Sequence, residues 1–181
     1  MKITRKLSLP DLAAGISEAC LKGGIDVVLS GGACVSIYTK NRYASYDLDF
    51  VLRVPVGRKR IRAAMGEIGF QEDGRHFRHP DTPYIVEFLS PPLSVGEEPV
   101  REIREVHTLN GTLRLLSPTD CVKDRLAAYY HWNDRPSLEQ AILVCKDADV
   151  DLDEVRRWSR REGMTEKLAS FERELRTRGG A

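Results

Sequence analysis

The sequence has no long apolar run and few cysteines, and each shortage excludes a class of protein. No stretch of the 181 residues approaches the roughly 20 consecutive apolar residues that a membrane-spanning helix needs. The four cysteines form no Cys-x-x-Cys pair, which argues against a zinc ribbon and against a disulfide framework. The first residues are basic but no apolar segment follows them, so we expect no secretory signal, no membrane partner and a cytoplasmic location.

An excess of charge of one sign is also missing. The chain has 28 Lys and Arg residues against 27 Asp and Glu residues, a net charge of +1, so no overall basic field indicates a nucleic-acid partner. Its composition, 41% hydrophobic and 30% charged, is typical of a globular domain and excludes disordered and fibrous classes. The length is sufficient for one domain with a sizeable buried core.

The hydrophobic pattern of the first two thirds of the chain mixes helices with strands. Apolar residues three and four positions apart, and the residues after a glycine pair, predict helices over 10–23, 33–38 and 59–68. Short apolar or alternating runs predict strands over 26–29, 48–54, 70–78 and 84–89, followed by a loop around 91–96. The dipeptide Asn110-Gly111 predicts a hairpin between strands at 106–109 and 113–116.

From Ser117 onward the pattern is helical. Ser117, Pro118 and Asp120 have the order of a cap residue, a first-turn proline and a first-turn acid, which predicts a helix start. The expected helices span 118–131, 136–147, 151–161 and 164–177. The chain is therefore predicted to be α+β, with an α/β core over 1–116 and a C-terminal helical region over 117–181, packed as one unit.

The segment Leu29-Ser30-Gly31-Gly32 joins a predicted strand to a predicted helix. Glycine lets backbone amides approach an anion closely, and a helix N-terminus favours negative charge, so this turn can hold a phosphate. The alternative is an ordinary tight turn, for which a glycine pair is equally suitable.

Two aspartates lie two residues apart in Asp47-Leu48-Asp49-Phe50. In a strand, residues i and i+2 point to the same face about 6.5–7 Å apart, so both carboxylates project together from an otherwise apolar segment. Such a pair is unfavourable unless a positive charge neutralises it, and a divalent cation with oxygen ligands is the natural candidate. The alternative is a turn-capping Asp47 and a solvent-facing Asp49.

A third acid, Glu87, lies in the apolar run Tyr84-Ile85-Val86-Glu87-Phe88-Leu89. Alternation places it on the face of Ile85 and Leu89, which argues against simple exposure. If this strand lies beside that of Asp47 and Asp49, three carboxylates meet at one place. We therefore predict Asp47, Asp49 and Glu87 as ligands of one or two Mg²⁺ or Mn²⁺ ions, which bind triphosphate oxygens and activate a hydroxyl.

The glycine pair and the carboxylate pair together resemble the signature of the DNA polymerase β-type nucleotidyltransferase superfamily. More narrowly, the chain is similar to the abortive-infection toxin-like nucleotidyltransferases of bacteria and archaea. The residues that carry this likeness are Ser30-Gly31-Gly32-Ala33, Arg42 and Ser45-Tyr46-Asp47-Leu48-Asp49-Phe50. The resemblance covers roughly residues 25–145 and implies a small mixed β-sheet with helices and an α-helical C-terminal part.

The resemblance also implies roles for individual residues. The three acids would bind metal, and Ser30, Gly31 and Gly32 would hold the triphosphate. A lysine of the first helix after the sheet often assists in that family, and Lys123 is the matching position in this chain. The stretch 133–139 departs from the family pattern, and the spacing from Gly32 to Asp47 is slightly longer than usual.

These residues lead to the hypothesis of a metal-dependent nucleotidyltransferase that moves a nucleoside monophosphate, for example from ATP, to an acceptor hydroxyl. The resemblance implies RNA or tRNA, a protein or a small molecule as the acceptor, and an antitoxin-like protein as a partner. A catalytically silent nucleotide-binding or interaction module on the same fold is the alternative, which the departure at 133–139 favours. A metal-dependent phosphodiesterase that uses water as the acceptor is a third possibility.

The histidines and one aromatic run give weaker indications of function. His76, His79, His107 and His131 show no metal-ligand spacing, so we expect surface or hydrogen-bonded side chains. The aromatic run Tyr129-Tyr130-His131-Trp132 is expected to pack between helices, with a base-stacking platform as the alternative.

Overall fold

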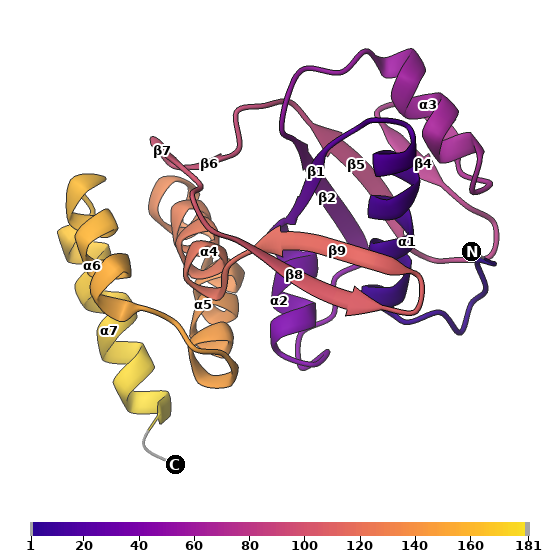
Figure 1. The fold of residues 1–181 in the computed structure, drawn as a ribbon. Helices are drawn as coiled ribbons and strands as arrows, with labels where there is room; N and C mark the ends of the chain where they lie inside the picture. The colour runs from indigo at the N-terminus through magenta and orange to yellow at the C-terminus, as the bar shows by residue number, and fades with distance from the viewer. Residues whose placement is uncertain (1, 180–181) are drawn as a thin grey trace.

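The structure is a computed structural model that describes residues 2–179, and it combines seven helices with a mixed sheet (Figure 1). The helices are α1 (Leu9–Lys22), α2 (Gly31–Tyr38), α3 (Arg58–Gly66), α4 (Pro118–Trp132), α5 (Arg135–Asp147), α6 (Leu152–Arg161) and α7 (Thr165–Gly179). The strands are β1 (Val27–Ser30), β2 (Asp47–Leu52), β3 (Gln71–Asp73), β4 (His76–Arg78), β5 (Ile85–Leu89), β6 (Ser94–Val95), β7 (Glu98–Pro99), β8 (Ile103–Thr108) and β9 (Gly111–Leu116). The expected α+β class is confirmed.

Seven strands form the main sheet in the order β3-β4-β5-β2-β1-β9-β8. The pairs β2–β5 and β1–β9 are parallel, and the other neighbours are antiparallel. These directions bring the ends of β1 and β9 and the starts of β2, β5 and β8 to one edge of the sheet. This edge is where the glycine turn and the predicted acids lie.

Because side chains alternate along each strand, the two faces of the sheet present different residues. Phe50, Phe77 and Phe88 pack together on one face, with ring centroids 6.0 Å apart for Phe50–Phe88 and 5.6 Å apart for Phe77–Phe88. Helix α3 covers this face, since the Arg58 guanidinium lies 4.6 Å from the Phe77 ring centroid, and α1 packs against α3. Because alternate residues point to opposite faces, Asp49 projects from the other side of β2.

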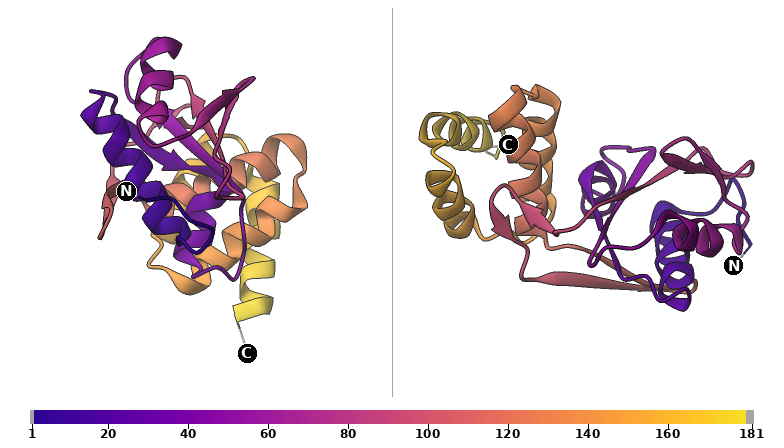
Figure 2. Two further views of the ribbon diagram at one scale, coloured as in Figure 1. Left: turned by 90° about the vertical axis from the view of Figure 1, so that its right-hand side faces the viewer. Right: turned by 90° about the horizontal axis from the view of Figure 1, so that it is seen from above.

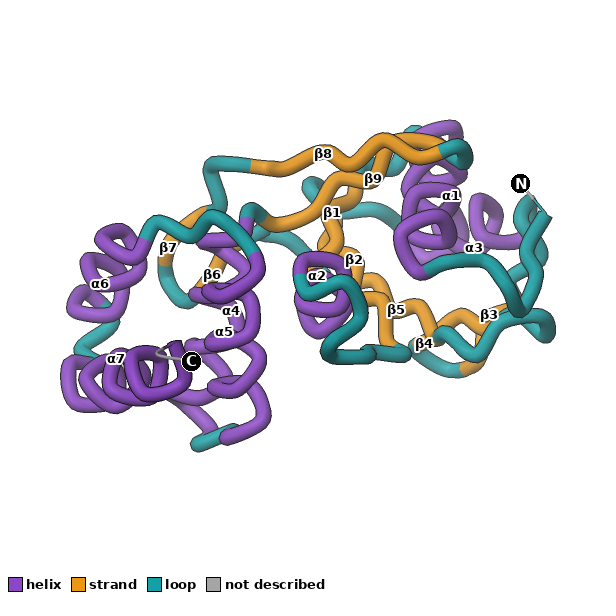
Figure 3. The backbone as a smooth tube through the Cα atoms, turned by 90° about the horizontal axis from the view of Figure 1, so that it is seen from below, coloured by secondary structure: helices purple, strands orange, loops and turns teal. Residues whose placement is uncertain are grey.

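The C-terminal helices gather at one end of the molecule, as the right-hand view of Figure 2 shows. Helix α2 lies between the strands and the pair α4 and α5 (Figure 3), and it contacts both helices. The small hairpin β6–β7 also packs on α4, and the Trp158 Nε1 of α6 donates a hydrogen bond of 3.2 Å to the Val95 carbonyl. Contacts therefore cross the domain boundary predicted at residue 116.

Three predicted elements differ in detail from the structure. The strand expected over 70–78 is two short strands, because Gly74 adopts a φ of +60° and turns the chain. The expected loop around 91–96 contains the hairpin β6–β7, which turns at Gly96 with a φ of +58°. Helix α2 begins at Gly31, two residues before its predicted start.

The cysteines and the aromatic run follow the packing expectations. Cys20, Cys34 and Cys121 are buried and reduced, and Cys145 is half-buried. Tyr129 and Tyr130 are buried, and Tyr130 stacks on Trp158 with 5.7 Å between ring centroids, so the expected interhelical packing is confirmed for these two. Trp132 instead is 77% exposed. Among residues 2–179, no helix is both long and apolar enough to cross a bilayer.

Candidate active site

The three predicted carboxylates line one small cavity at the sheet edge. Asp49 and Glu87 lie directly opposite each other in the parallel register of β2 and β5, and Asp47 lies two residues before Asp49 on the same face. The cavity has a volume of about 160 Å³. It is lined by Asp47, Asp49, Arg75, His76, Ile85 and Glu87. The structure therefore places the two acidic strands side by side, which is the condition that the metal-site hypothesis set.

The carboxyl group of Asp49 is electrostatically the most perturbed of the three. The pKa of Asp49 is raised to about 6. Burial is the largest cause, and the neighbouring charges of Glu87 and Asp47 add to it. The Arg125 guanidinium of α4 acts in the opposite direction and lowers the pKa of Asp49, by less than these effects raise it. The cavity thus has negative charge that its own side chains do not fully compensate.

The cavity offers oxygen donors of the kind that a divalent cation requires. Within residues 2–179, no three Asp, Glu, His or Cys side chains are arranged to hold a metal ion by themselves. Mg²⁺ usually binds proteins through one or two carboxylates and completes its shell with waters and substrate phosphates. The oxygen donors of Asp47 and Asp49 fit this second kind of site, in which a bound phosphate supplies the remaining ligands.

The glycine turn lies directly beside Asp49. Ser30 is opposite Asp49 in the antiparallel register of β1 and β2, and its Oγ donates a hydrogen bond of 3.2 Å to the Asp49 carbonyl. Gly31 has a φ of +67°, and a Cβ at this position would lie 2.5 Å from Asp49 Oδ2. Only glycine accommodates both the left-handed backbone and this approach.

The first amides of α2 have no side-chain cap. Helix α2 begins at Gly31, and the Ser30 side chain makes no capping hydrogen bond to its first amides. A Cβ on Gly32 would lie 3.0 Å from Ser45 Oγ, so this second glycine is also closely approached. Uncapped amides at a helix N-terminus form a suitable site for phosphate oxygens.

Ser45 reaches Gly32 because the connection from α2 to β2 folds back on the helix. The Asn41 amide donates to the Ser36 carbonyl at 2.8 Å, and the Ser45 amide donates to Ser36 Oγ at 2.8 Å. The longer spacing between Gly32 and Asp47 is used for this return path. No sequence pattern indicates that Ser45 lies beside the glycine turn, since only the folded path of 39–46 brings it there.

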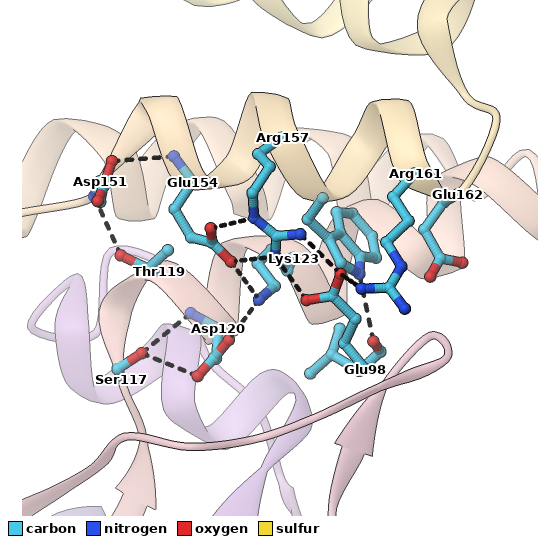
Figure 4. Close-up of polar contacts among 12 residues, drawn as sticks. Glu98, Ser117, Thr119, Asp120, Lys123, Asp151, Glu154, Arg157, Arg161 and Glu162 are labelled. Atoms are coloured by element: carbon cyan, nitrogen blue, oxygen red, sulfur yellow. Dashed lines mark hydrogen bonds and ion pairs between the residues drawn. The ribbon is translucent and has the colours of Figure 1, made fainter.

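Lys123 lies elsewhere (Figure 4). Its ammonium is 2.9 Å from Asp120 Oδ1 and 3.2 Å from Glu154 Oε1, and its side chain is only 7% exposed. It lines a separate cavity of about 600 Å³ between α4, α6 and the segment from β7 to β8. The structure does not bring Lys123 to the cavity of the three carboxylates.

The surroundings of Lys123 form an ion-pair network that joins α4, α6 and β7. Arg157 forms a hydrogen bond of 2.6 Å to Glu154 Oε2 and contacts both carboxylate oxygens of Glu98 at 2.9 Å and 2.6 Å. Hydrogen bonds from Arg157, and secondarily from Lys123, lower the pKa of Glu154 to about 2. These contacts link the β6–β7 hairpin to the C-terminal helices.

Two other residues at the cavity were not predicted. His76 is paired with Glu87 across β4 and β5, with 3.3 Å between His76 Nε2 and Glu87 Oε2. Arg75 Nε lies 3.5 Å from Glu87 Oε1. The spacing of the histidines in the sequence does not indicate the contact between His76 and Glu87. That contact depends on the pairing of β4 with β5, which brings together residues eleven positions apart.

Comparisons with known proteins identify the fold. No protein-family model matches the sequence, and no curated protein matches it. The chain superposes on an antigenic nucleotidyltransferase-like protein from Paracoccidioides brasiliensis with a TM-score of 0.61, at 12% identity over 78% of this chain and 77% of that one. The fold is that of a nucleotidyltransferase.

Two solved structures of ANT(2'')-Ia also match this nucleotidyltransferase fold more loosely. The solution structure of this antibiotic-resistance factor has a TM-score of 0.45 at 14% identity, and covers 94% of this chain and 91% of that one. The crystal structure in complex with adenylyl-2''-tobramycin has a TM-score of 0.47 at 13% identity, over 92% and 95%. The fold assignment depends on the first comparison and on the observed topology.

The close approach of Gly31 to Asp49 makes a first prediction for this nucleotidyltransferase fold. Gly31→Ala should lower the free energy of unfolding by roughly 2–4 kcal/mol, because the substitution combines a strained φ with a steric conflict. Gly66→Ala is the matched control: no atom lies within 4 Å of its Cβ position in α3, and alanine favours a helix. Urea unfolding measures both variants, and equal effects would contradict the steric role of Gly31.

The raised pKa of Asp49 predicts a pH-dependent gain in stability on its neutralisation. Because the folded-state pKa of about 6 exceeds the ordinary value of 3.8, ionised Asp49 destabilises the fold above pH 6. Asp49→Asn should therefore stabilise the metal-free protein by about 1–3 kcal/mol at pH 8, on the basis of 1.36 kcal/mol per pKa unit. The gain should disappear below about pH 4. Urea unfolding in EDTA at both pH values measures it, and a pH-independent effect would refute the electrostatic cause.

The ion-pair network makes a third prediction. Lys123→Met should destabilise the protein by roughly 2–4 kcal/mol, because it leaves Asp120 and Glu154 without a shared buried cation. Lys22→Met is the control, since Lys22 has an exposed ion pair with Glu18 at 3.6 Å and should change stability by less than about 0.5 kcal/mol. Thermal unfolding compares the two, and indistinguishable melting temperatures would show that the network adds no stability.

Proposed function

We propose that the protein is a metal-dependent nucleotidyltransferase that transfers a nucleoside monophosphate from a nucleoside triphosphate to an acceptor hydroxyl. The observation that carries this proposal is the joint position of three carboxylates and an uncapped glycine turn at one sheet edge. The nucleotidyltransferase fold supports it. The finer assignment as the toxin of a toxin–antitoxin pair rests on the sequence resemblance.

The proposed roles follow from the position of each group. Asp47 and Asp49 would hold Mg²⁺ or Mn²⁺, with Glu87 as the third carboxylate, and the ion would supply positive charge to the triphosphate oxygens. Ser30, Gly31 and Gly32 would position the triphosphate through backbone amides at the start of α2. This arrangement acts by orientation and charge stabilisation more than by covalent chemistry.

The reaction would be a single displacement at the α-phosphorus. The acceptor oxygen forms the new bond to phosphorus, the bond from the α-phosphorus to the bridging oxygen breaks, and pyrophosphate leaves with the electron pair. The Glu87 carboxylate, on the side of β2 away from the glycine turn, can take up the hydroxyl proton. Lys123, which the resemblance implies as a phosphate partner, would first have to leave Asp120 and Glu154.

The second candidate function is a nucleotide-binding or interaction module without turnover. The pairing of Glu87 with His76 and Arg75 favours it, because these contacts engage one of the three acids. This module would bind nucleotide without releasing pyrophosphate. Pyrophosphate release that depends on Asp47 would exclude it.

Incubation with labelled nucleoside triphosphates, Mg²⁺ and either total RNA or total protein tests the proposed reaction. Asp47→Asn and Asp49→Asn should each lower label transfer by at least about 100-fold, because each removes an anionic ligand of the ion that would neutralise the triphosphate. Asp81→Asn, an exposed acid outside the cavity, should transfer label at the wild-type rate. Transfer that persists in Asp49→Asn would contradict the proposal, and release of free monophosphate alone would indicate the phosphodiesterase.

A further inference from the structure

The order of the strands separates the two sides of the proposed reaction. Gly31, at the end of β1, contacts Asp49 on one side of β2, and Glu87 lies on the other side in β5. Attacking and leaving oxygens lie roughly in line in phosphoryl transfer. If the glycine turn holds the triphosphate, the acceptor hydroxyl therefore approaches from the side of β5 and β4.

On that side, the cavity wall carries two basic side chains beside Glu87. Arg75 and His76 come from the β3–β4 hairpin, and both line the cavity and lie close to the Glu87 carboxylate. The Arg75 side chain is 76% exposed, and its contact with Glu87 is long at 3.5 Å. An exposed ion pair of this kind contributes little stability, so the guanidinium can turn to a ligand at small cost.

The charge of this wall selects among acceptors. With a divalent ion held by Asp47 and Asp49 as proposed, the negative charge of these two carboxylates is neutralised. The Arg75 guanidinium then attracts an anionic group of the acceptor and repels a cationic one. The planar guanidinium matches phosphate with two parallel hydrogen bonds, a geometry that lysine does not offer. The carboxylates alone would repel such an acceptor, so a positive side chain at the point of entry is required.

Building on the proposed function, we infer that the acceptor carries a phosphate group near its reacting hydroxyl and that Arg75 binds this phosphate. Arg75 is then a substrate-binding residue on the acceptor side, and His76 lies beside it with 3.2 Å between Arg75 Nε and His76 Nε2. A phosphorylated small molecule and the hydroxyl end of a polynucleotide share this chemistry. The experiment separates these two sources.

Direct binding tests the inference without requiring turnover. Isothermal titration is carried out with wild-type protein, Mg²⁺ and a non-hydrolysable nucleoside triphosphate, and compares glycerol 3-phosphate with glycerol. Glycerol 3-phosphate should bind, and glycerol should not. Arg75→Ala should weaken binding at least about tenfold, as expected for loss of a charge-assisted bidentate contact, and Arg75→Lys should recover part of it.

Arg62→Ala is the matched control. Arg62 is also an exposed arginine paired with a glutamate, Glu72, but it belongs to α3, on the opposite face of the sheet. Its replacement should leave glycerol 3-phosphate binding unchanged. Equal binding of glycerol, an unaffected Arg75→Ala variant, or equal losses in both variants would overturn the inference, as would preferential binding of the polycation tobramycin.

A short RNA with a free 3′-hydroxyl forms the second arm of the titration. Arg75-dependent binding tighter than that of glycerol 3-phosphate assigns the phosphate to a polynucleotide, and the reverse order assigns it to a small molecule; both support the inference. If the protein binds the acceptor phosphate but is not a transferase, the result differs from failure of this inference. Arg75-dependent binding is then present, but wild-type protein transfers no label to either probe.

Discussion

The approach of the Asp49 carboxylate to the Gly31 backbone is the contact on which the rest of the site depends. It brings a carboxylate with uncompensated negative charge against a turn whose amides favour negative charge from a ligand. Two groups with opposite electrostatic preferences are thus held side by side. In the proposed function, a nucleoside triphosphate with a divalent cation would satisfy both, because it would present anionic oxygens to the amides and positive charge to the carboxylates. Glycine at position 31 makes that proximity possible.

Two cationic side chains of helix α4 face different parts of the structure, although ion pairs hold both of them: Arg125 Nη2 lies 2.6 Å from Asp124 Oδ2 on the same helix. Residues 123 and 125 are two positions apart and point about 200° from each other around the axis. Lys123 faces α6 and is held by Asp120 and Glu154. Arg125 contacts Gln140 of α5 at 3.4 Å and influences Asp49. The neighbours of each cation depend on where α5 and α6 pack, which the residues around Lys123 in the sequence do not indicate.

Local signals in the sequence accounted for most of the fold. The Ser117 cap, the Asn110-Gly111 turn and the spacing of apolar residues predicted elements whose bounds agree with the structure within a few residues. The carboxylates were also predictable, because a pair of acids two residues apart in an apolar strand has an evident electrostatic cost. Arg75 and Ser45 were not, since each reaches the site only through a turn whose path depends on pairing with distant segments.

The side of the cavity formed by the β3–β4 hairpin has more specific side chains than the side of the glycine turn. In the proposed reaction, the glycine turn and Asp49 bind only the triphosphate group with its metal ion, and this group is the same in every nucleoside triphosphate. The β3–β4 hairpin has no such common partner, and it lies at the end of the strand order, where its exposed side chains, unlike the buried Phe77, can vary with little effect on the core. Arg75 and His76 are exposed and half-buried, respectively, and both line the cavity beside Glu87. In the proposed reaction, selection among acceptors would therefore fall to this hairpin, whereas the buried strands β1 and β2 would determine how the nucleotide is held.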